Sequence, residues 1–357
     1  MTVETKSVEL TFRPMEATEH DLQLFHRCFE TNGSPRSLDM LRWQYFAPPA
    51  GKLLVDLAVT AGSDPRLAAI YAVFPIWMRA GNNRVLGVQS LNTLTDEAFR
   101  GKGLFLKMAA SLYARAEAEH VGMVYGFPNG NSAHGFFKRL SWETLDPMPI
   151  LIRPLRSGYV LRKLHAGALS KLFDIPLGLA RSPKLPSGYS LRTVAQPTAE
   201  FDTLWERFST SFHFAVERSA EYLTWRLQRP GESYEIVGLY KNETLIGYSV
   251  IGSVRTAENE LVGKLMELVF DPSDDIAAKA LVAESLHRLK NRECTVVWSW
   301  NFEHSPGHAA YRDSGFIPVP EKLQPSEGHV GVRAFGALQG VADRAQWYIS
   351  MFDSDAE

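Results

Sequence analysis

The stretch TLTDEAFRGKGLFLKM, residues 93–108, determines how the rest of the chain is interpreted. An apolar run of β type, residues 84–94, leads into it, and an amphipathic helical pattern follows from Leu104. The short loop between them carries two glycines and the basic residues Arg100 and Lys102. Free N–H groups and the positive end of a helix dipole meet at such a helix start, so this order predicts an anion site. A pyrophosphate group is the ligand that this arrangement favours most.

This loop resembles the pyrophosphate loop of the GNAT acyltransferases (Gcn5-related N-acetyltransferases), whose usual pattern is Gln/Arg-x-x-Gly-x-Gly/Ala. Arg100 and Gly103 match the pattern, whereas Phe105 replaces its final small residue. Neither the dinucleotide fingerprint nor a Walker loop is present. The resemblance implies acyl-CoA, in the first place acetyl-CoA, as co-substrate. Its pyrophosphate is expected over the N–H groups of Gly101, Lys102, Gly103 and Leu104.

The order of the expected elements extends the resemblance beyond the loop. Strands are expected at residues 10–14, 53–60, 67–78, 84–94 and 122–127, and helices at 20–29, 37–46, 104–120 and 132–140. This is the GNAT order. The resemblance implies an α+β fold in which a mixed, mostly antiparallel central sheet is flanked by helices.

A later segment, residues 131–142, resembles the family motif Asn-x-x-Ala-x-x-x-Tyr-x-x-x-Gly-Phe. Ala133 fits, Phe137 occupies the tyrosine position, and Asn129 and Asn131 flank the asparagine position. The resemblance adds Asn129, Asn131 and Phe137 to the expected cofactor-binding residues.

The second half of the sequence repeats the first. Arg36-Ser37 with Leu41, Trp43 and Pro48 recurs as Arg218-Ser219 with Leu223, Trp225 and Pro230. Each pair differs by 182 positions (218 − 36). A further match relates residues 134–137 to residues 308–311. These repeats predict two tandem copies of one fold.

The two copies differ at the loop. In place of Arg-x-x-Gly, the second copy has Asp271, Asp274 and Asp275, which suit a helix start but repel a pyrophosphate. We therefore expect the first copy to bind the cofactor and the second not to. Tyr311 stands at the family's tyrosine position in the second copy, where a packing role is expected.

The expected domain organisation follows from the repeat. An N-terminal GNAT domain is placed at residues 8–150, a basic linker at 151–186 with a helix near 160–173, a degenerate GNAT-like domain at 187–335 and a tail at 336–357.

Composition describes a globular protein, with 357 residues, 45% hydrophobic residues and a formal charge of −2. This charge gives no general attraction to nucleic acid or anionic membrane. Cys28 and Cys294 lack the spacing of redox or zinc sites, no signal peptide is apparent and no apolar run is long enough for a membrane span. We expect a cytoplasmic protein that uses no metal, with Cys28 in the core.

The implied reaction is transfer of an acyl group to an amine. The resemblance implies a bulged strand at Thr93, Leu94 and Thr95, where a backbone N–H polarises the thioester carbonyl. A base must also deprotonate the amine. The candidates are Asp96 or Glu97 at the strand end, His134 on the late helix, or a water ordered by Gln89, Ser90 and Asn92.

Protonation of the leaving thiolate has no obvious donor, because Phe137 carries no proton. Ser132, His134, Tyr125, a water or a residue from the second copy or the tail are the options, unless the thiolate leaves unaided.

Three functions stay open. The first is an N-acetyltransferase that acts on a small amine such as an amino sugar. The second is a non-catalytic module that binds a metabolite or a partner. The third is an aminoacyl transferase that resembles the FemAB group, although that group usually lacks a coenzyme A loop.

Overall fold

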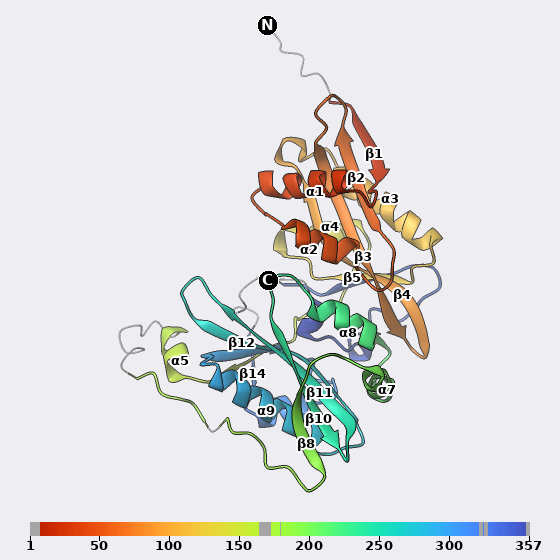
Figure 1. Ribbon diagram of the computed structural model, residues 1–357. Coiled ribbons are helices and arrows are strands. Elements are labelled where there is room, and N and C mark those ends of the chain that lie inside the picture. The colour runs from red at the N-terminus through yellow and green to blue at the C-terminus, as the bar shows by residue number, and fades with distance from the viewer. Residues whose placement is uncertain (1–7, 164–172, 179, 321–323, 325–327, 355–357) are drawn as a thin grey trace. The chain divides into compact units, whose positions relative to one another are not determined.

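A computed structural model of the chain describes residues 8–163, 173–178, 180–320, 324 and 328–354. These residues form two compact units, which are described separately (Figure 1). The first unit contains the chain up to Met78, Arg84–Leu145 and Gly328–Ala342. The second unit contains Arg79–Asn83, the stretch from Asp146 to the residue before Gly328, and the chain from Asp343 onward.

The first unit follows the element order that the sequence predicts. Its elements are β1 (Leu10–Pro14), α1 (Glu19–Thr31), α2 (Leu38–Tyr45), β2 (Leu54–Thr60), β3 (Leu67–Ala80), β4 (Asn83–Thr95), the short 3-10 helix η1 (Glu97–Phe99), α3 (Leu104–Ala118), β5 (Met123–Gly126), α4 (Gly130–Arg139), β6 (Glu143–Thr144) and, from much later in the chain, β15 (Gly331–Ala334). The sheet order is β1-β2-β3-β4-β5-β15-β6. Strands β4 and β5 are parallel, with Gly87 opposite Met123, and β15 runs antiparallel to both β5 and β6.

The second unit repeats this plan. Its elements are β7 (Ile150–Pro154), α5 (Ser157–Lys163), β8 (Tyr189–Val194), α7 (Ala199–Phe208), η2 (Ser209–Ser211), β9 (Phe214–Val216), α8 (Ala220–Leu227), β10 (Tyr234–Lys241), β11 (Thr244–Arg255), β12 (Leu261–Phe270), α9 (Ala277–Asn291), β13 (Val296–Trp300), α10 (His308–Asp313), β14 (Ile317–Pro318), η4 (Arg344–Gln346) and η5 (Met351–Asp353). The sheet order is β14-β7-β13-β12-β11-β10-β8, with β12 and β13 parallel. Helix α9 packs on β10, β11 and β12.

In the strand order given for each sheet, one strand comes from the other half of the sequence. Strand β15 follows the second repeat in the chain, yet it lies between β5 and β6 of the first sheet. Strand β7 follows the first repeat, yet it lies between β13 and β14 of the second sheet. The two repeats have therefore exchanged equivalent strands.

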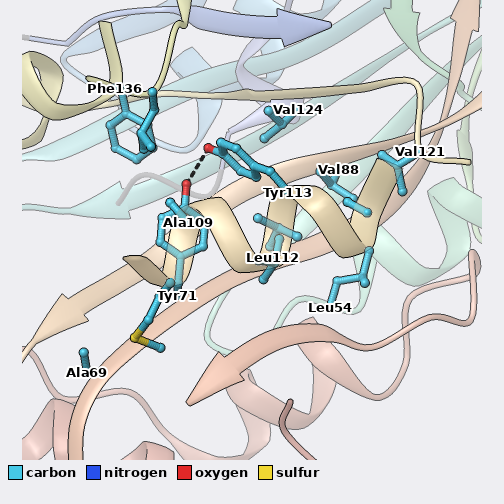
Figure 2. Close-up of a cluster of buried hydrophobic side chains, with 14 of the residues drawn as sticks. Leu54, Ala69, Tyr71, Val88, Ala109, Leu112, Tyr113, Val121, Val124 and Phe136 are labelled. Atoms are coloured by element: carbon cyan, nitrogen blue, oxygen red, sulfur yellow. Dashed lines mark hydrogen bonds between the residues drawn. The ribbon is translucent and has the colours of Figure 1, made fainter. Parts of the chain in front are cut away.

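The core of the first unit lies between the sheet and α3. Strand β2 is buried along its whole length, including Asp56, whose carboxylate pairs with Arg115 of α3 at 2.5 Å. The cluster in Figure 2 joins Tyr71 of β3 to Tyr113 of α3 through a hydrogen bond of 2.5 Å between their hydroxyls. The indole Nε1 of Trp142 also donates to the Tyr113 hydroxyl, at 2.9 Å. Burial raises the pKa of Tyr113 to about 12, so its hydroxyl is a structural group.

The predicted α+β class is confirmed, with two mixed, mostly antiparallel sheets flanked by helices. The residues assigned to a linker need a correction, because Ile150–Pro154 forms a strand inside the second sheet. The helix predicted near residues 160–173 corresponds to α5, which begins earlier, at Ser157. Residues 164–172 lie outside the described part of the chain. Cys28 is buried as predicted, and burial raises the pKa of its thiol to about 12. No helix among the described residues is long and apolar enough to cross a membrane.

Candidate active site

The predicted phosphate loop leaves its backbone donors open. Gly101 and Gly103 have φ angles of 77° and 71°, a conformation that side chains disfavour, and a Cβ at either position would meet nothing within 4 Å. Gly103 is the N-cap of α3, and no side chain caps the helix there. Within the described chain, none of the N–H groups from Gly101 to Leu106 donates to a protein acceptor. These donors and the helix dipole fit an anion such as a pyrophosphate.

The two basic residues of the loop are accessible. Arg100 makes an ion pair with Glu97 at 3.3 Å, and both side chains are mostly exposed, so this pair contributes little to stability. The Lys102 ammonium lies 4.8 Å from the centre of the Phe99 ring. Both cations can therefore turn toward an anion at the loop without a large loss of protein contacts.

Phe105, the departure from the family pattern, points into the core. Its ring contacts the rings of Tyr71 and Phe136, with centroid distances of 5.8 and 5.3 Å. A Cβ on Gly135 of α4 would come within 2.7 Å of this ring. The glycine at 135 thus makes room for the phenylalanine at 105.

A cavity of about 300 Å³ lies where β4 and β5 diverge beyond their last paired residues, Ser90 and Gly126. It is lined by Phe29, Ser34, Arg36, Ser90, Leu91, Asn92, Thr93, Leu94, Gly126, Phe127, Pro128, Asn129, Ser132, Phe136 and Trp142. Aromatic rings and hydroxyl or amide groups share this lining. A hollow in which several polar groups converge beside aromatic rings can hold and orient a polar small molecule.

The irregularity expected in β4 occurs at Asn92. This residue has a φ angle of 50°, which interrupts the regular pleat just before Thr93. Its side-chain amide donates to Gln44 Oε1 at 2.8 Å and to the Tyr45 hydroxyl at 2.9 Å. These two contacts fix the amide orientation, and its oxygen lies 3.4 Å from Nε of Arg36. The buried hydroxyl of Thr93 meets no hydrogen-bond partner among the residues that the structure describes.

The other expected catalytic residues lie apart from this cavity lining. Asp96 caps η1 by accepting from the Ala98 N–H at 3.0 Å, and Asn32 donates to its other oxygen at 3.2 Å. Glu97 pairs with Arg100, and His134 is exposed on α4. None of the described residues that line the cavity carries a carboxylate or an imidazole.

The late motif contributes to the cavity in part. Asn129 lines it and caps α4 by accepting from the Ser132 N–H at 3.1 Å, whereas Asn131 is exposed. Phe137 packs edge-on against His329, with ring centres 5.7 Å apart. Of the side chains considered as proton donors, Ser132 lines the cavity. Tyr125 does not, since it is buried and its hydroxyl donates to Gln89 Oε1 at 3.3 Å.

The sequence analysis did not identify Arg36 as a site residue. The Arg-Ser pair recurs in both halves, and such a repeat has the ordinary explanation of a structural turn before a helix. The two copies differ in the residues that Arg36 and Arg218 contact, and these contacts can be seen only in the folded chain.

The loop of the second unit is closed by its own carboxylates. Asp274 accepts from the N–H groups of Ile276 and Ala277, at 3.2 and 3.1 Å, and from the Tyr189 hydroxyl at 2.7 Å. Burial would raise the pKa of Asp274, but these hydrogen bonds outweigh it and hold the pKa below its ordinary value. Tyr311 is buried, with its hydroxyl 3.4 Å from Ser299 Oγ, and burial raises its pKa.

The chain end completes the second unit. We call residues 343–354 the tail segment. Within it, Asp353 accepts from the fully buried Arg218 at 2.8 Å, and the Tyr348 hydroxyl donates to Glu267 and to the Leu268 carbonyl oxygen. Arg218 also donates to Glu267, so two buried carboxylates share one guanidinium.

The comparisons with known proteins agree with this geometry. Residues 11–145 match the family described as acetyltransferase (GNAT) domain, and this part of the chain is a GNAT domain. No curated protein matches the sequence. The matched part of the chain is thus a GNAT domain by family, and the second unit repeats its sheet plan.

Particular solved structures resemble the whole chain. N-myristoyltransferase from Saccharomyces cerevisiae with bound myristoyl-CoA has a TM-score of 0.60 at 12% identity, and the match covers 91% of this chain and 82% of that one. A GCN5-related N-acetyltransferase from Anabaena variabilis has a TM-score of 0.62 at 10% identity, with 90% and 72% covered. A protein of unknown function from Enterococcus faecalis, a probable N-acyltransferase, has a TM-score of 0.57 at 12% identity, with 92% and 71% covered. At these identities the likeness is one of fold.

Proposed function

We propose that the protein is an acyl-CoA-dependent N-acyltransferase, with acetyl-CoA as donor and a small amine as acceptor, and that transfer takes place in the first unit. The observation that carries the proposal is the contrast between the two helix starts. At α3 the N–H groups are open beside Arg100 and Lys102, whereas at the start of α9 Asp274 accepts from the N–H groups of Ile276 and Ala277. This contrast supports placing the anionic cofactor in the first unit.

Bound acyl-CoA supplies a thioester, whose carbonyl carbon is attacked by the amine as the C–N bond forms, the C–S bond breaks and the thiolate departs. In the proposal the loop from Arg100 to Leu104 holds the pyrophosphate. Residues 92–95 of β4 hold the reacting carbonyl, and a backbone donor there contributes about 2.7–4 kcal/mol of transition-state stabilisation. The cavity beside them receives the amine.

Proton transfers in this site rely on water. The polar groups that line the cavity, Ser90, Asn92 and Ser132, can hold a water that takes the proton from the attacking amine. A thiol such as that of cysteine has a pKa of about 8.5, so the thiolate leaves readily near neutral pH. Ser132, which lines the cavity, is the candidate to protonate it. Phe137 takes no part in proton transfer.

A thermal-shift titration with acetyl-CoA tests the proposal. A ligand at about 100 times its Kd adds about 2.7 kcal/mol of stability, which corresponds to roughly 5 to 11 °C for a unit of this size. Gly103→Glu is expected to abolish the shift, because it places a carboxylate among the donors. Gly103→Asn tolerates the positive φ without adding charge and should retain a measurable shift.

Gly51→Glu is the matched control. Gly51 has a φ of 66°, is exposed and has open space around it, as at position 103. The control carries the same backbone strain and charge change away from the loop, so it should keep the full shift. An undiminished shift in Gly103→Glu would refute the loop assignment. A shift without acylation of any amine in a broad panel would favour a non-catalytic binding protein instead.

A further inference from the structure

Arg36 and Arg218 occupy equivalent positions in the two units. Each precedes a short helix whose N-cap is a serine. Ser37 accepts from the Met40 N–H at 3.1 Å, and Ser219 accepts from the Tyr222 N–H at 3.2 Å. The two arginines therefore occupy the same position relative to equivalent helices.

The strand residues that face these arginines are also equivalent. Parallel pairing begins at Gly87 in β4 and at Val262 in β12. Asn92 and Glu267 lie five positions further along their strands. Nε of Arg36 contacts Asn92, and Nε of Arg218 donates to Glu267.

The second unit shows what this arginine position binds. Arg218 donates through its terminal Nη2 to Asp353 at 2.8 Å and to Ser350 Oγ at 3.1 Å. Asp353 belongs to the tail segment, which is not part of the repeated fold. A carboxylate brought by another piece of the chain therefore occupies the guanidinium of this unit.

In the first unit the equivalent guanidinium, that of Arg36, faces a cavity. Arg36 is half-buried, lines the 300 Å³ cavity and has no carboxylate partner among the described residues. Its guanidinium makes weak contacts with the protein, 3.4 Å to Asn92 Oδ1, 3.3 Å to the Pro35 carbonyl oxygen and 5.8 Å to the centre of the Phe29 ring. The strand residue is a neutral asparagine here instead of a glutamate, so the charge of Arg36 is not neutralised by its neighbour on β4.

We propose that Arg36 binds a carboxylate of the acceptor, which is therefore an amine that also carries a carboxylate, as an α-amino acid does. The inference rests on the proposed acyl transfer and names the substrate class of that site. The acceptor carboxylate takes the place at Arg36 that Asp353 takes at Arg218. The amine of the same molecule then lies in the cavity beside residues 92–94, and the carboxylate is unchanged by the reaction.

A planar guanidinium suits this task because it offers paired N–H donors that match a carboxylate. Hydrogen bonds of this charged type change affinity by roughly 10- to 150-fold. A neutral amino sugar would gain nothing from the unpaired cation. Arg36 is therefore a specificity residue that contacts the substrate.

The test compares amino acids with their carboxamides, which differ only in the negative charge. The standard α-amino acids and their amides are screened with acetyl-CoA by release of the free thiol. For the best amino acid we expect kcat/KM to exceed that of its amide by at least tenfold. Arg36→Met should reduce kcat/KM for the acid roughly 10- to 150-fold and leave the amide nearly unaffected, and Arg36→Lys should lose part of the preference.

Arg42→Met is the matched control. Arg42 lies on the adjoining α2, pairs with Glu19 and Asp39 on the surface and does not line the cavity. Its replacement should leave the preference for the acid unchanged. Thermal unfolding verifies that both variants are folded.

Three results would overturn the inference. These are an equal loss for acid and amide in Arg36→Met, a weakened acetyl-CoA thermal shift in that variant, or a neutral amino sugar as the best acceptor. The second result would assign Arg36 to the cofactor. If wild type binds acetyl-CoA but acylates nothing, the proposed function fails. Binding then decides the inference. In the presence of coenzyme A, an amino acid that raises the melting temperature of wild type should not raise that of Arg36→Met.

Discussion

Replacing Arg218 by methionine tests how the second unit is held together. The guanidinium is fully buried, and Glu267 and Asp353, which it contacts, have side chains no more than 2% exposed. Arg218→Met removes the positive charge and leaves two buried carboxylates near each other. Breaking a buried pair in this way costs about 3–5 kcal/mol. For a unit of this size the melting temperature should fall by roughly 6 to 20 °C.

The loss should depend on pH in a defined direction. Without Arg218, burial and mutual repulsion raise the pKa values of the two carboxyl groups. Protonation then relieves the native state, so the stability deficit should be largest near pH 8 and should shrink toward pH 5. Denaturant unfolding of wild type and variant at both pH values measures the deficit.

Arg36→Met provides the internal control. Arg36 holds the equivalent position without a carboxylate partner among the described residues, so its loss should cost less than about 1 kcal/mol. Combining Arg218→Met with Glu267→Leu and Asp353→Leu should restore part of the lost stability, because the two carboxylates that lack a counter-charge are removed. The recovery should be incomplete, because Tyr348 and Ser350 lose Glu267 as an acceptor. Equal losses for Arg36→Met and Arg218→Met, or a deficit that does not change with pH, would refute the reasoning.

Three further predictions concern the first unit. Gly135→Val should lower stability by about 1–3 kcal/mol in denaturant unfolding, because its side chain collides with the ring of Phe105, and Phe105→Leu in the same chain should recover part of the loss. Tyr113→Phe should cost about 1–3 kcal/mol, because it leaves the buried groups of Tyr71 and Trp142 without their shared partner, and a loss below 0.5 kcal/mol, roughly the floor for a hydrogen bond, would contradict the network. With a simple amine, kcat/KM should rise about tenfold per pH unit up to the pKa of that amine, since the described cavity lining offers no carboxylate or imidazole; a plateau beginning near pH 6–7 would instead indicate a protein base.

Local patterns in the sequence were sufficient for most of the first unit. The apolar runs of β2 to β4 and the amphipathic helices predicted elements within a few residues of their observed bounds, because each is decided by its own periodicity. The loop from Arg100 to Gly103 was recognised because a strand, glycines and a helix start lie next to one another in the chain. Its role in binding stays a prediction.

The strand exchange could not be predicted in this way. Gly331–Ala334 and Ile150–Pro154 are short, neither was predicted as a strand, and their residues carry no signal for the sheet that they join. The sequence-based boundaries at residues 150 and 335 assume that each repeat keeps its own strands. Only the pairing of β15 with β5 and of β7 with β13 decides this.

The candidate site was predictable where chemistry is local and not where it depends on partners. Asn92 was singled out and lines the cavity, whereas the carboxylate of Asp96 is engaged as a helix cap. Phe105 looked unfavourable in the motif, and its compatibility depends on Gly135, thirty positions away. Arg36 was noticed only as part of a repeat, because nothing next to it in sequence marks its cavity.

The exchanged strands also set the order in which the protein can be made. The first sheet needs Gly331–Ala334 between β5 and β6, so it cannot be completed on the ribosome until nearly the whole chain has been synthesised. Translation stopped between the repeats would yield a sheet with an open edge beside β5, which is exposed to pairing with other chains. A fragment that holds one repeat alone would therefore lack a strand of its sheet, so the two repeats depend on each other to complete their folds.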